Sequence, residues 1–288
     1  MSYFYLLVSV FMGASSSVFG KFFGRKNANI KDSSRLYNCL QLASVFTLWC
    51  ILYIFNFSFD ARVLPYCLLF AVCFTVCNIG IINSLRHGPM TLTSLFSSLS
   101  LILTTVWGFA FWDDEVTVVV AVGLVLVVTS IYLCLYTGKK EEKKISLKWV
   151  LFILMAFFGN AGCSIVQRTQ QMNFDGQHKY MLMTFATFLS ALSCLIIYLK
   201  GSKTDTGDIL KKSWYLPTMA GSCNVVLNLF VMFLASSPLS PSFIYPVIGV
   251  GGLMVVTLFS LFVFKEKLKW QQWVGIALGT IATVLLSI

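Results

Sequence analysis

The chain has 288 residues, of which 58% are hydrophobic and 11% charged, and its formal net charge is +10. Its mean hydropathy of +0.83 is too high for a soluble globule, which could not bury so many apolar side chains, so we expect a lipid bilayer to be its solvent. The basic residues fall almost entirely in short connections between apolar runs, so we interpret them as determinants of membrane topology and expect no nucleic-acid partner.

Ten apolar runs of about transmembrane length follow one another along the chain. They cover residues 3–24, 34–55, 63–85, 91–112, 115–137, 148–170, 178–200, 214–235, 240–264 and 270–288. Each is long enough to cross a hydrocarbon core of ~30 Å as an α-helix rising ~1.5 Å per residue. The runs are continuous and do not alternate as the strands of a β-barrel do, so helices are the way to satisfy their backbone groups. The predicted fold is an all-α integral membrane bundle of ten transmembrane helices.

A charged connector divides these runs into two sets of five. Residues 138–147 separate a first repeat at 1–137 from a second repeat at 148–288. Three pairs of residues coincide after a shift of 152 positions: Pro89 and Pro241, Asp114 and Glu266, and Gly123 and Gly275. Because five is odd, two such repeats enter the membrane from opposite sides. We therefore expect two inverted five-helix repeats around a central cavity.

The placement of positive charge predicts the orientation. If the N-terminus lies outside, most loop Lys and Arg residues fall inside, and only Arg62, Arg168 and Lys179 fall in outer connections. Positive residues favour the cytoplasmic side, so both termini are predicted outside. The very short tails favour a multi-pass protein of the bacterial plasma (inner) membrane, although a Golgi carrier of sugar nucleotides would have a similar architecture.

Polar side chains inside the runs are the candidate substrate contacts, because a polar group in hydrocarbon must be paired or face water. The amide candidates are Asn78, Asn83, Asn160, Gln167, Asn224 and Asn228. Amides donate and accept hydrogen bonds without carrying charge, so they suit a neutral or zwitterionic solute. The alternative is that they only join helices to one another. Trp107 and Tyr245 are candidate aromatic walls of the same cavity.

Lys21 is the cation that lies inside a run. It is about one turn from the inner end of the first run, so its ammonium group can either extend to the headgroups or contact a substrate. Every acidic residue is assigned to a loop or to the end of a run, and no carboxylate is predicted in mid-membrane.

Small residues and prolines are predicted to serve packing and gating. The candidates are Gly13, Ser17, Gly20, Pro89, Pro241, Pro246, Gly249, Gly275 and Gly279. The prolines and glycines of the ninth run predict a bent or broken helix. The Gly275 and Gly279 pair permits close helix approach, either within the chain or across a homodimer. The hydroxyl-rich fourth run is interpreted mainly as packing and bending devices.

Enzyme chemistry is not indicated. The sequence has no His-Glu-x-x-His or Gly-x-Ser-x-Gly motif, and His87 and His178 are predicted outside the hydrocarbon core. Nine cysteines without a Cys-x-x-Cys pair are interpreted as small buried apolar residues. We expect no catalytic residues, no metal and no cofactor.

The last two runs contain Pro241, Glu266, Gln272, Gly275 and Gly279, and the first repeat keeps Pro89, Asp114 and Gly123 but has Val120 in place of Gln272. With these residues the last two runs resemble the EamA-like family of the drug/metabolite transporter superfamily. The resemblance implies a carrier with a cavity between its halves that works by alternating access without a cofactor. Such families move many cargoes, so the resemblance does not name the substrate.

The expected function is therefore secondary transport of a small polar metabolite, amino-acid-like or otherwise neutral or zwitterionic, with membrane lipids as the other partners. One alternative is a flippase or a carrier of a lipid-linked or anionic sugar or phosphate precursor, for which Lys21 and Arg25 would supply charge. Another is a membrane interaction protein that transports nothing, and a solid apolar core would favour it.

Overall fold

The computed structural model describes residues 2–30, 32–111, 118–135, 146–201, 207–235 and 241–285, which form helices and no strand. The elements are α1 (Ser2–Lys26), α2 (Ser33–Phe55), η1 (Ala61–Val63), α3 (Leu64–His87), α4 (Met90–Leu99), α5 (Leu101–Phe111), α6 (Val118–Leu135), α7 (Leu147–Asn173), α8 (Lys179–Leu199), α9 (Gly207–Ser213), α10 (Tyr215–Ala235), α11 (Pro241–Phe262) and α12 (Trp270–Leu285). Most of the predicted connector at 138–147 and the acid Asp114 lie outside the described residues.

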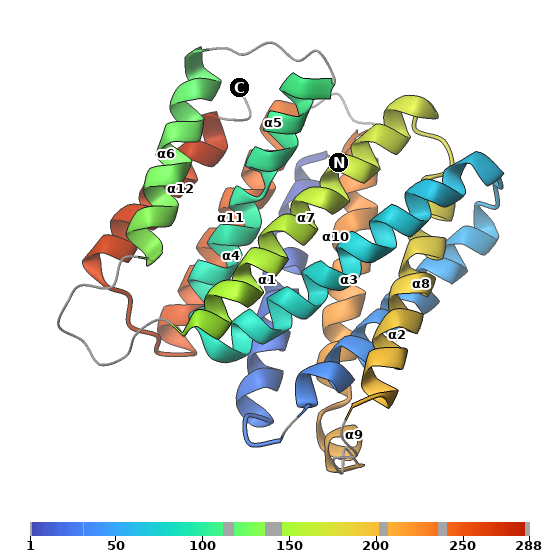
Figure 1. Ribbon diagram of the computed structural model, residues 1–288, viewed down its shortest axis with the longest axis horizontal. Coiled ribbons are helices and arrows are strands. Elements are labelled where there is room, and N and C mark those ends of the chain that lie inside the picture. The colour runs from blue at the N-terminus through green and yellow to red at the C-terminus, as the bar shows by residue number, and fades with distance from the viewer. Residues whose placement is uncertain are drawn as a thin grey trace.

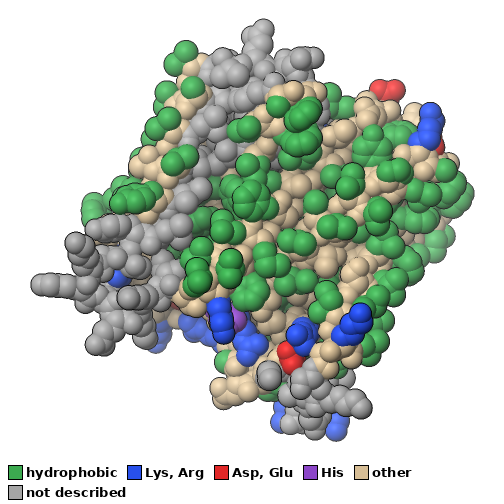
Figure 2. All heavy atoms as spheres, viewed as in Figure 1, with side chains coloured by type: hydrophobic (Ala, Val, Ile, Leu, Met, Phe, Trp, Pro, Cys, Tyr) green, Lys and Arg blue, Asp and Glu red, His purple; other side chains and the backbone are tan. Residues whose placement is uncertain are grey.

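Six of the described helices are long and apolar enough to cross a bilayer: α1, α2, α3 with η1, α7, α8 and α10. Large apolar side chains cover much of the face in Figure 2, and Phe55 and Leu199 are 81% and 70% exposed. A surface of this kind is stable in lipid and costly in water. The chain thus has the all-helical fold of a multi-pass membrane protein.

Prolines mark the starts of two helices, as the repeated pattern predicts. Pro89 immediately precedes α4, and Pro241 is the first residue of α11. The fixed φ of proline suits the first turn of a helix, where its missing N–H has no intrahelical partner to lose.

The fourth run is interrupted, whereas the ninth run, for which a bent or broken helix is expected, is not broken. Over its described length α11 continues without a break through Pro246, its sixth residue, where the lost N–H affects only the first turns. The fourth run divides at Ser100 into α4 and α5. There the hydroxyl of Ser100 donates to the carbonyl of Ser97 at 2.6 Å, and side-chain bonds of this kind compete with the helical ladder.

The helices of the first half lie mainly against helices of the second half. Helix α1 packs along α10, α3 along α7, α2 along α8, α6 along α12, and α4 along α11. In Figure 1, α6 and α12 form one edge of the bundle and α2 and α8 the opposite edge. The pairs between these edges surround the candidate site.

Lys and Arg residues gather at one end of the bundle, which we call the basic end. Its members include Arg25, Lys26, Arg35, Arg86 and Lys212, which contact the ends of neighbouring helices or their loops at Phe264, Lys212, Gly201, Ala28 and Lys26. Direct contacts join its loops, for example Lys26 Nζ donates to the carbonyl of Lys212 at 2.7 Å. Figure 1 shows α9 at this end, along the lower edge, and the start of α1 in the upper half of the view.

Backbone-to-backbone packing joins α3 to α7. A Cβ atom added to Gly159 would lie 2.6 Å from the backbone nitrogen of Cys77 and 2.9 Å from the carbonyl oxygen of Cys73. Only a residue without a side chain fits at this distance. The contact sets the depth at which α7 presents its next residue, Asn160, to the interior.

Gly275 and Gly279 serve packing within the chain. The hydroxyl of Ser130 on α6 donates to the carbonyl of Gly275 at 2.7 Å. A Cβ on Gly279 would lie 2.7 Å from Leu95 Cδ1 of α4 and 2.7 Å from the Ser130 hydroxyl. The glycine face is therefore covered by α6 and α4, and a homodimer formed through this face is not supported.

Candidate functional site

A cavity of about 310 Å³ lies inside the bundle, between α1, α2, α3, α4, α7, α10 and α11. Its polar lining residues are Ser9, Ser16, Ser17, Tyr37, Gln41, Asn78, Thr93, Ser94, Ser97, Ser98, Asn160 and Asn224. None of the residues described in its lining carries a formal charge. The cavity therefore offers hydrogen bonds from neutral groups inside an apolar protein.

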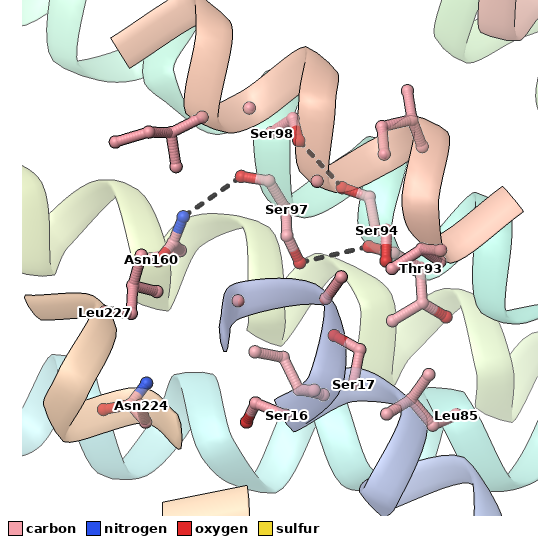
Figure 3. Close-up of a pocket in the computed structure, with 18 of the residues that line it drawn as sticks. Ser16, Ser17, Leu85, Thr93, Ser94, Ser97, Ser98, Asn160, Asn224 and Leu227 are labelled. Atoms are coloured by element: carbon pink, nitrogen blue, oxygen red, sulfur yellow. Dashed lines mark hydrogen bonds between the residues drawn. The ribbon is translucent and has the colours of Figure 1, made fainter. Parts of the chain in front are cut away.

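One wall consists of the hydroxyl groups of α4 (Figure 3). Ser97 Oγ donates to the carbonyl of Thr93 and Ser98 Oγ to the carbonyl of Ser94, both at 3.1 Å. These bonds satisfy the hydroxyl protons inside the helix and leave the oxygen lone pairs facing the cavity. This wall therefore presents mainly hydrogen-bond acceptors.

Asn160 joins α7 to the interruption between α4 and α5. Its Nδ2 donates to the carbonyl of Ser97 at 3.0 Å and to Ser100 Oγ at 2.7 Å, and Figure 3 shows the amide directed at Ser97. Both amide hydrogens are used, so Oδ1 is the group that remains for a solute. Asn160 thus stabilises the interrupted helix and contributes an acceptor to the cavity.

The facing wall carries Asn224 of α10, Asn78 of α3 and Gln41 of α2. Asn228 lies one turn beyond Asn224 and donates to its carbonyl at 2.8 Å and to its Oδ1 at 3.3 Å. Asn78 Nδ2 donates to the carbonyl of Phe74 at 2.8 Å. The side chain of Asn224 is therefore held by a neighbour on its own helix, with its amino group directed away from that contact.

Several predicted site residues do line the cavity. They are Asn78, Asn160 and Asn224 among the amides, and Gly13, Ser17 and Gly249 among the small residues. Gly20 instead serves packing, because a Cβ there would lie 3.0 Å from Leu85 Cδ1 and 3.2 Å from the Tyr37 hydroxyl.

Other predicted residues lie away from the cavity. Asn83 donates to the carbonyl of Ile79 at 2.8 Å on its own helix, and Gln167 lies on α7 outside the lining. Trp107 is 40% exposed and stacks on Phe111 with the ring centroids 4.2 Å apart. The side chains of Tyr245, Pro241 and Pro246 lie outside the described residues.

Lys21 neither reaches the headgroups nor lines the cavity. Its Nζ lies 2.8 Å from Glu266 Oε1, and the two side chains are only 8% and 11% exposed. The sequence places Glu266 correctly in the connection between α11 and α12, but this carboxylate folds back into the bundle. Arg25 is also engaged, because its guanidinium donates to the carbonyl of Phe264 at 2.7 Å.

The polar residues of α2 are the part of the lining that the sequence interpretation missed. Tyr37 and Gln41 line the cavity from α2, in which the sequence predicts no site residue. A signal was present, because Ser34, Asn38 and Gln41 recur at helical spacing and all are buried. The serines of α4 were noticed, but their direction toward a cavity depends on tertiary packing.

Comparisons with known proteins give the fold. No protein-family model and no curated protein sequence matches the chain. One solved structure, described as a crystal structure of a protein, is similar with a TM-score of 0.61 and 10% sequence identity, over 96% of this chain and 95% of its own. At this identity the similarity concerns the fold alone, and it extends over the whole bundle.

Proposed function

We propose that the chain is a secondary transporter that moves a small neutral or zwitterionic polar metabolite across a membrane by alternating access. The observation that carries this proposal is the cavity lined by hydroxyl and amide groups inside an otherwise apolar bundle. Polar groups in a membrane protein face one another or a watery path, and here they converge from α1, α4, α7 and α10.

The helix pairing supports two inverted five-helix repeats. If α1 corresponds to α7 and α3 to α10, exchanging the halves turns the α1–α10 contact into the α7–α3 contact, and both contacts are extensive. The pairs α2–α8, α6–α12 and α4–α11 then map onto themselves. A two-fold relation in the membrane plane has this effect, and it is the plan of many alternating-access carriers.

Ten spans follow if α4 and α5 together make one crossing and α6, α11 and α12 make one each. The proposed orientation places the basic end in the cytoplasm of a bacterium and both termini outside, because cytoplasmic loops are enriched in Lys and Arg. Membership of the EamA-like family remains part of the same proposal.

The lining favours uncharged solutes over anionic ones. An ion without a counter-charge in a site of low dielectric loses several kcal/mol of hydration free energy. The cations that an anionic headgroup would need, Lys21 and Arg25, are bonded to Glu266 and to the carbonyl of Phe264. The flippase alternative thus lacks its proposed charges, and a polar cavity argues against an interaction protein with a solid core.

The test is uptake into proteoliposomes, with glutamine, serine and leucine as uncharged-side-chain solutes and glutamate and lysine as charged ones. Asn224→Ala, which removes a lining amide, is expected to lower uptake of the transported solute by about tenfold or more, since a lost hydrogen bond to a buried partner costs about 1–3 kcal/mol. Gln167→Ala is the matched control, because this amide lies outside the lining. Equal uptake by both variants, or no uptake of any solute above empty liposomes, would contradict the proposal.

A further inference from the structure

The ion pair of Lys21 and Glu266 is bonded on every side. Lys21 Nζ lies 2.8 Å from Glu266 Oε1 and donates to the carbonyls of Leu85 at 2.9 Å and Gly88 at 2.6 Å, which uses all three ammonium protons. Glu266 Oε2 accepts from the backbone N–H of Met90 at 2.9 Å and from Ser260 Oγ at 2.5 Å. All three protons of Lys21 and both carboxylate oxygens of Glu266 are therefore engaged within the protein.

The pair joins the two halves of the chain at four elements. Lys21 belongs to α1, its carbonyl partners end α3, Met90 begins α4, and Glu266 follows α11. The backbone around Glu266 is shaped for the contact: Lys265 has a φ of +52°, and the N–H of Glu266 returns to the carbonyl of Ser260 at 3.0 Å. A left-handed residue at the end of a helix reverses the chain, and here it turns the carboxylate inward.

On α1, α4 and α11 the pair lies at the basic-end side of the cavity lining, and on α3 the lining reaches Leu85, whose carbonyl accepts from Lys21. Along α1 the lining extends from Ser9 to Ser17, and Lys21 follows one turn later. Along α11 it ends at Val256, before Glu266, and on α4 it begins at Thr93, after Met90. The ion pair thus stands between the cavity and the basic end.

Apolar residues pack at the end of the cavity next to the pair, where Leu85 and Val256 belong to the lining. Val18, Leu85, Met90, Val256 and Phe264 pack together there, and each is at most 6% exposed. The ring of Phe264 is in turn covered by Arg25, whose guanidinium carbon lies 4.8 Å from the ring centroid. The end of α1 therefore holds the end of α11 through an ion pair, a hydrogen bond and a ring contact.

We propose that Lys21 and Glu266 form the gate that closes the cavity toward the basic end, and that the pair must separate before a solute can leave on that side. This inference rests on the proposed transport function. In the closed state the two charges compensate each other in a dry site, and in the open state water hydrates each of them. Removing one charge leaves the other buried and uncompensated, so the population shifts toward the open state.

The experiment measures access to the cavity from the basic end. A cysteine is introduced by Ser94→Cys in the cavity wall, and its reaction with the impermeant reagent MTSET is followed in sealed, oriented vesicles by peptide mass spectrometry. Lys212→Cys, at an exposed position of the basic end, identifies the side that the reagent reaches. Mass spectrometry reports the modification of the peptide that carries the introduced cysteine, so the native cysteines do not have to be replaced.

Glu266→Gln is expected to raise the labelling rate from the basic end by about tenfold or more. The double variant Lys21→Met with Glu266→Gln is expected to return most of the way to the wild-type rate, because its closed state holds no buried charge. If Glu266→Gln does not fold, Ser260→Ala keeps both charges, removes one donor to the carboxylate, and is expected to raise the rate by a smaller factor.

Arg35→Gln is the matched control. It removes a cation from the same end, but one whose bond to Asp32 at 3.1 Å stays within the start of α2 and leaves the Arg35 side chain 41% exposed. Its labelling rate is expected to stay within about twofold of the wild type, since exposed pairs contribute little.

The proposal is overturned if Glu266→Gln, or Ser260→Ala in its place, labels at the wild-type rate, or if the double variant is as open as the single one. The test does not depend on a substrate. Labelling that follows the predicted order while no solute moves would leave the gate standing and the transport proposal refuted. Uptake of a solute together with equal labelling rates for all variants would support the transport proposal and refute the gate.

Discussion

At the scale of single residues, each polar group of the interior has one of two roles, and its bonds decide which. Lys21 and Glu266 are bonded to each other, to backbone groups and to the hydroxyl of Ser260. Asn160 uses its two donors on α4 and α5 and keeps one acceptor for the cavity. The amides that keep a free group in the cavity are therefore the residues expected to recognise a solute.

Asn160→Ala is expected to lower the stability of the fold by about 1–3 kcal/mol, because the carbonyl of Ser97 loses a donor in a buried site. Thermal unfolding in detergent, followed by tryptophan fluorescence, measures the effect. Ser164→Ala is the control, since its hydroxyl only donates back to the carbonyl of Asn160 at 3.2 Å on the same helix. Equal melting temperatures for the two variants would count against the role of Asn160 at the interruption.

The residue scale also shows what sequence reasoning can and cannot find. Asn78, Asn160 and Asn224 were identified because an amide in an apolar run is conspicuous on its own. The partner of Lys21 was not, because Glu266 is far away in sequence and only the turn at Lys265 brings it back into the bundle. Tyr37 and Gln41 were missed because α2 was interpreted from its apolar content alone.

At the scale of elements, one close helix contact and one helix interruption position the cavity walls. The Gly159 contact lets α7 approach α3 closely, and the hydroxyl groups of α4 allow the interruption at Ser100. Helix positions and the starts at Pro89 and Pro241 were predictable from apolar length and proline chemistry. The hydroxyl groups of the fourth run indicated bending, but the position of its interruption was not predicted, and a donor from α7 bonds to Ser100 there.

Gly159→Ala is expected to reduce the yield of folded protein sharply, because its Cβ would overlap the backbone of α3, and overpacking costs about 1–3 kcal/mol or more. Gly252→Ala is the matched control, since no atom lies within 4 Å of a Cβ at that position. Fluorescence-detected size-exclusion chromatography compares the two. A monodisperse Gly159→Ala protein with wild-type yield would contradict the close α3–α7 packing.

At the scale of the whole molecule, the bundle combines an apolar exterior with a polar cavity, and the buried ion pair lies on the basic-end side of that cavity. The exterior follows directly from composition. The cavity does not, because its lining comes from helices in both halves and only their pairing brings these residues together.

The central claim is that water and solute reach this cavity alternately from the two sides of the membrane. The most direct measurement is the reaction of a cysteine introduced by Ser17→Cys with MTSET added to either side of sealed vesicles, with Leu95→Cys, at a fully buried position, as the unreactive control. We predict that Ser17→Cys reacts from both sides, faster from the side opposite the basic end. If Ser17→Cys reacts no faster than Leu95→Cys from either side of the membrane, the account is contradicted.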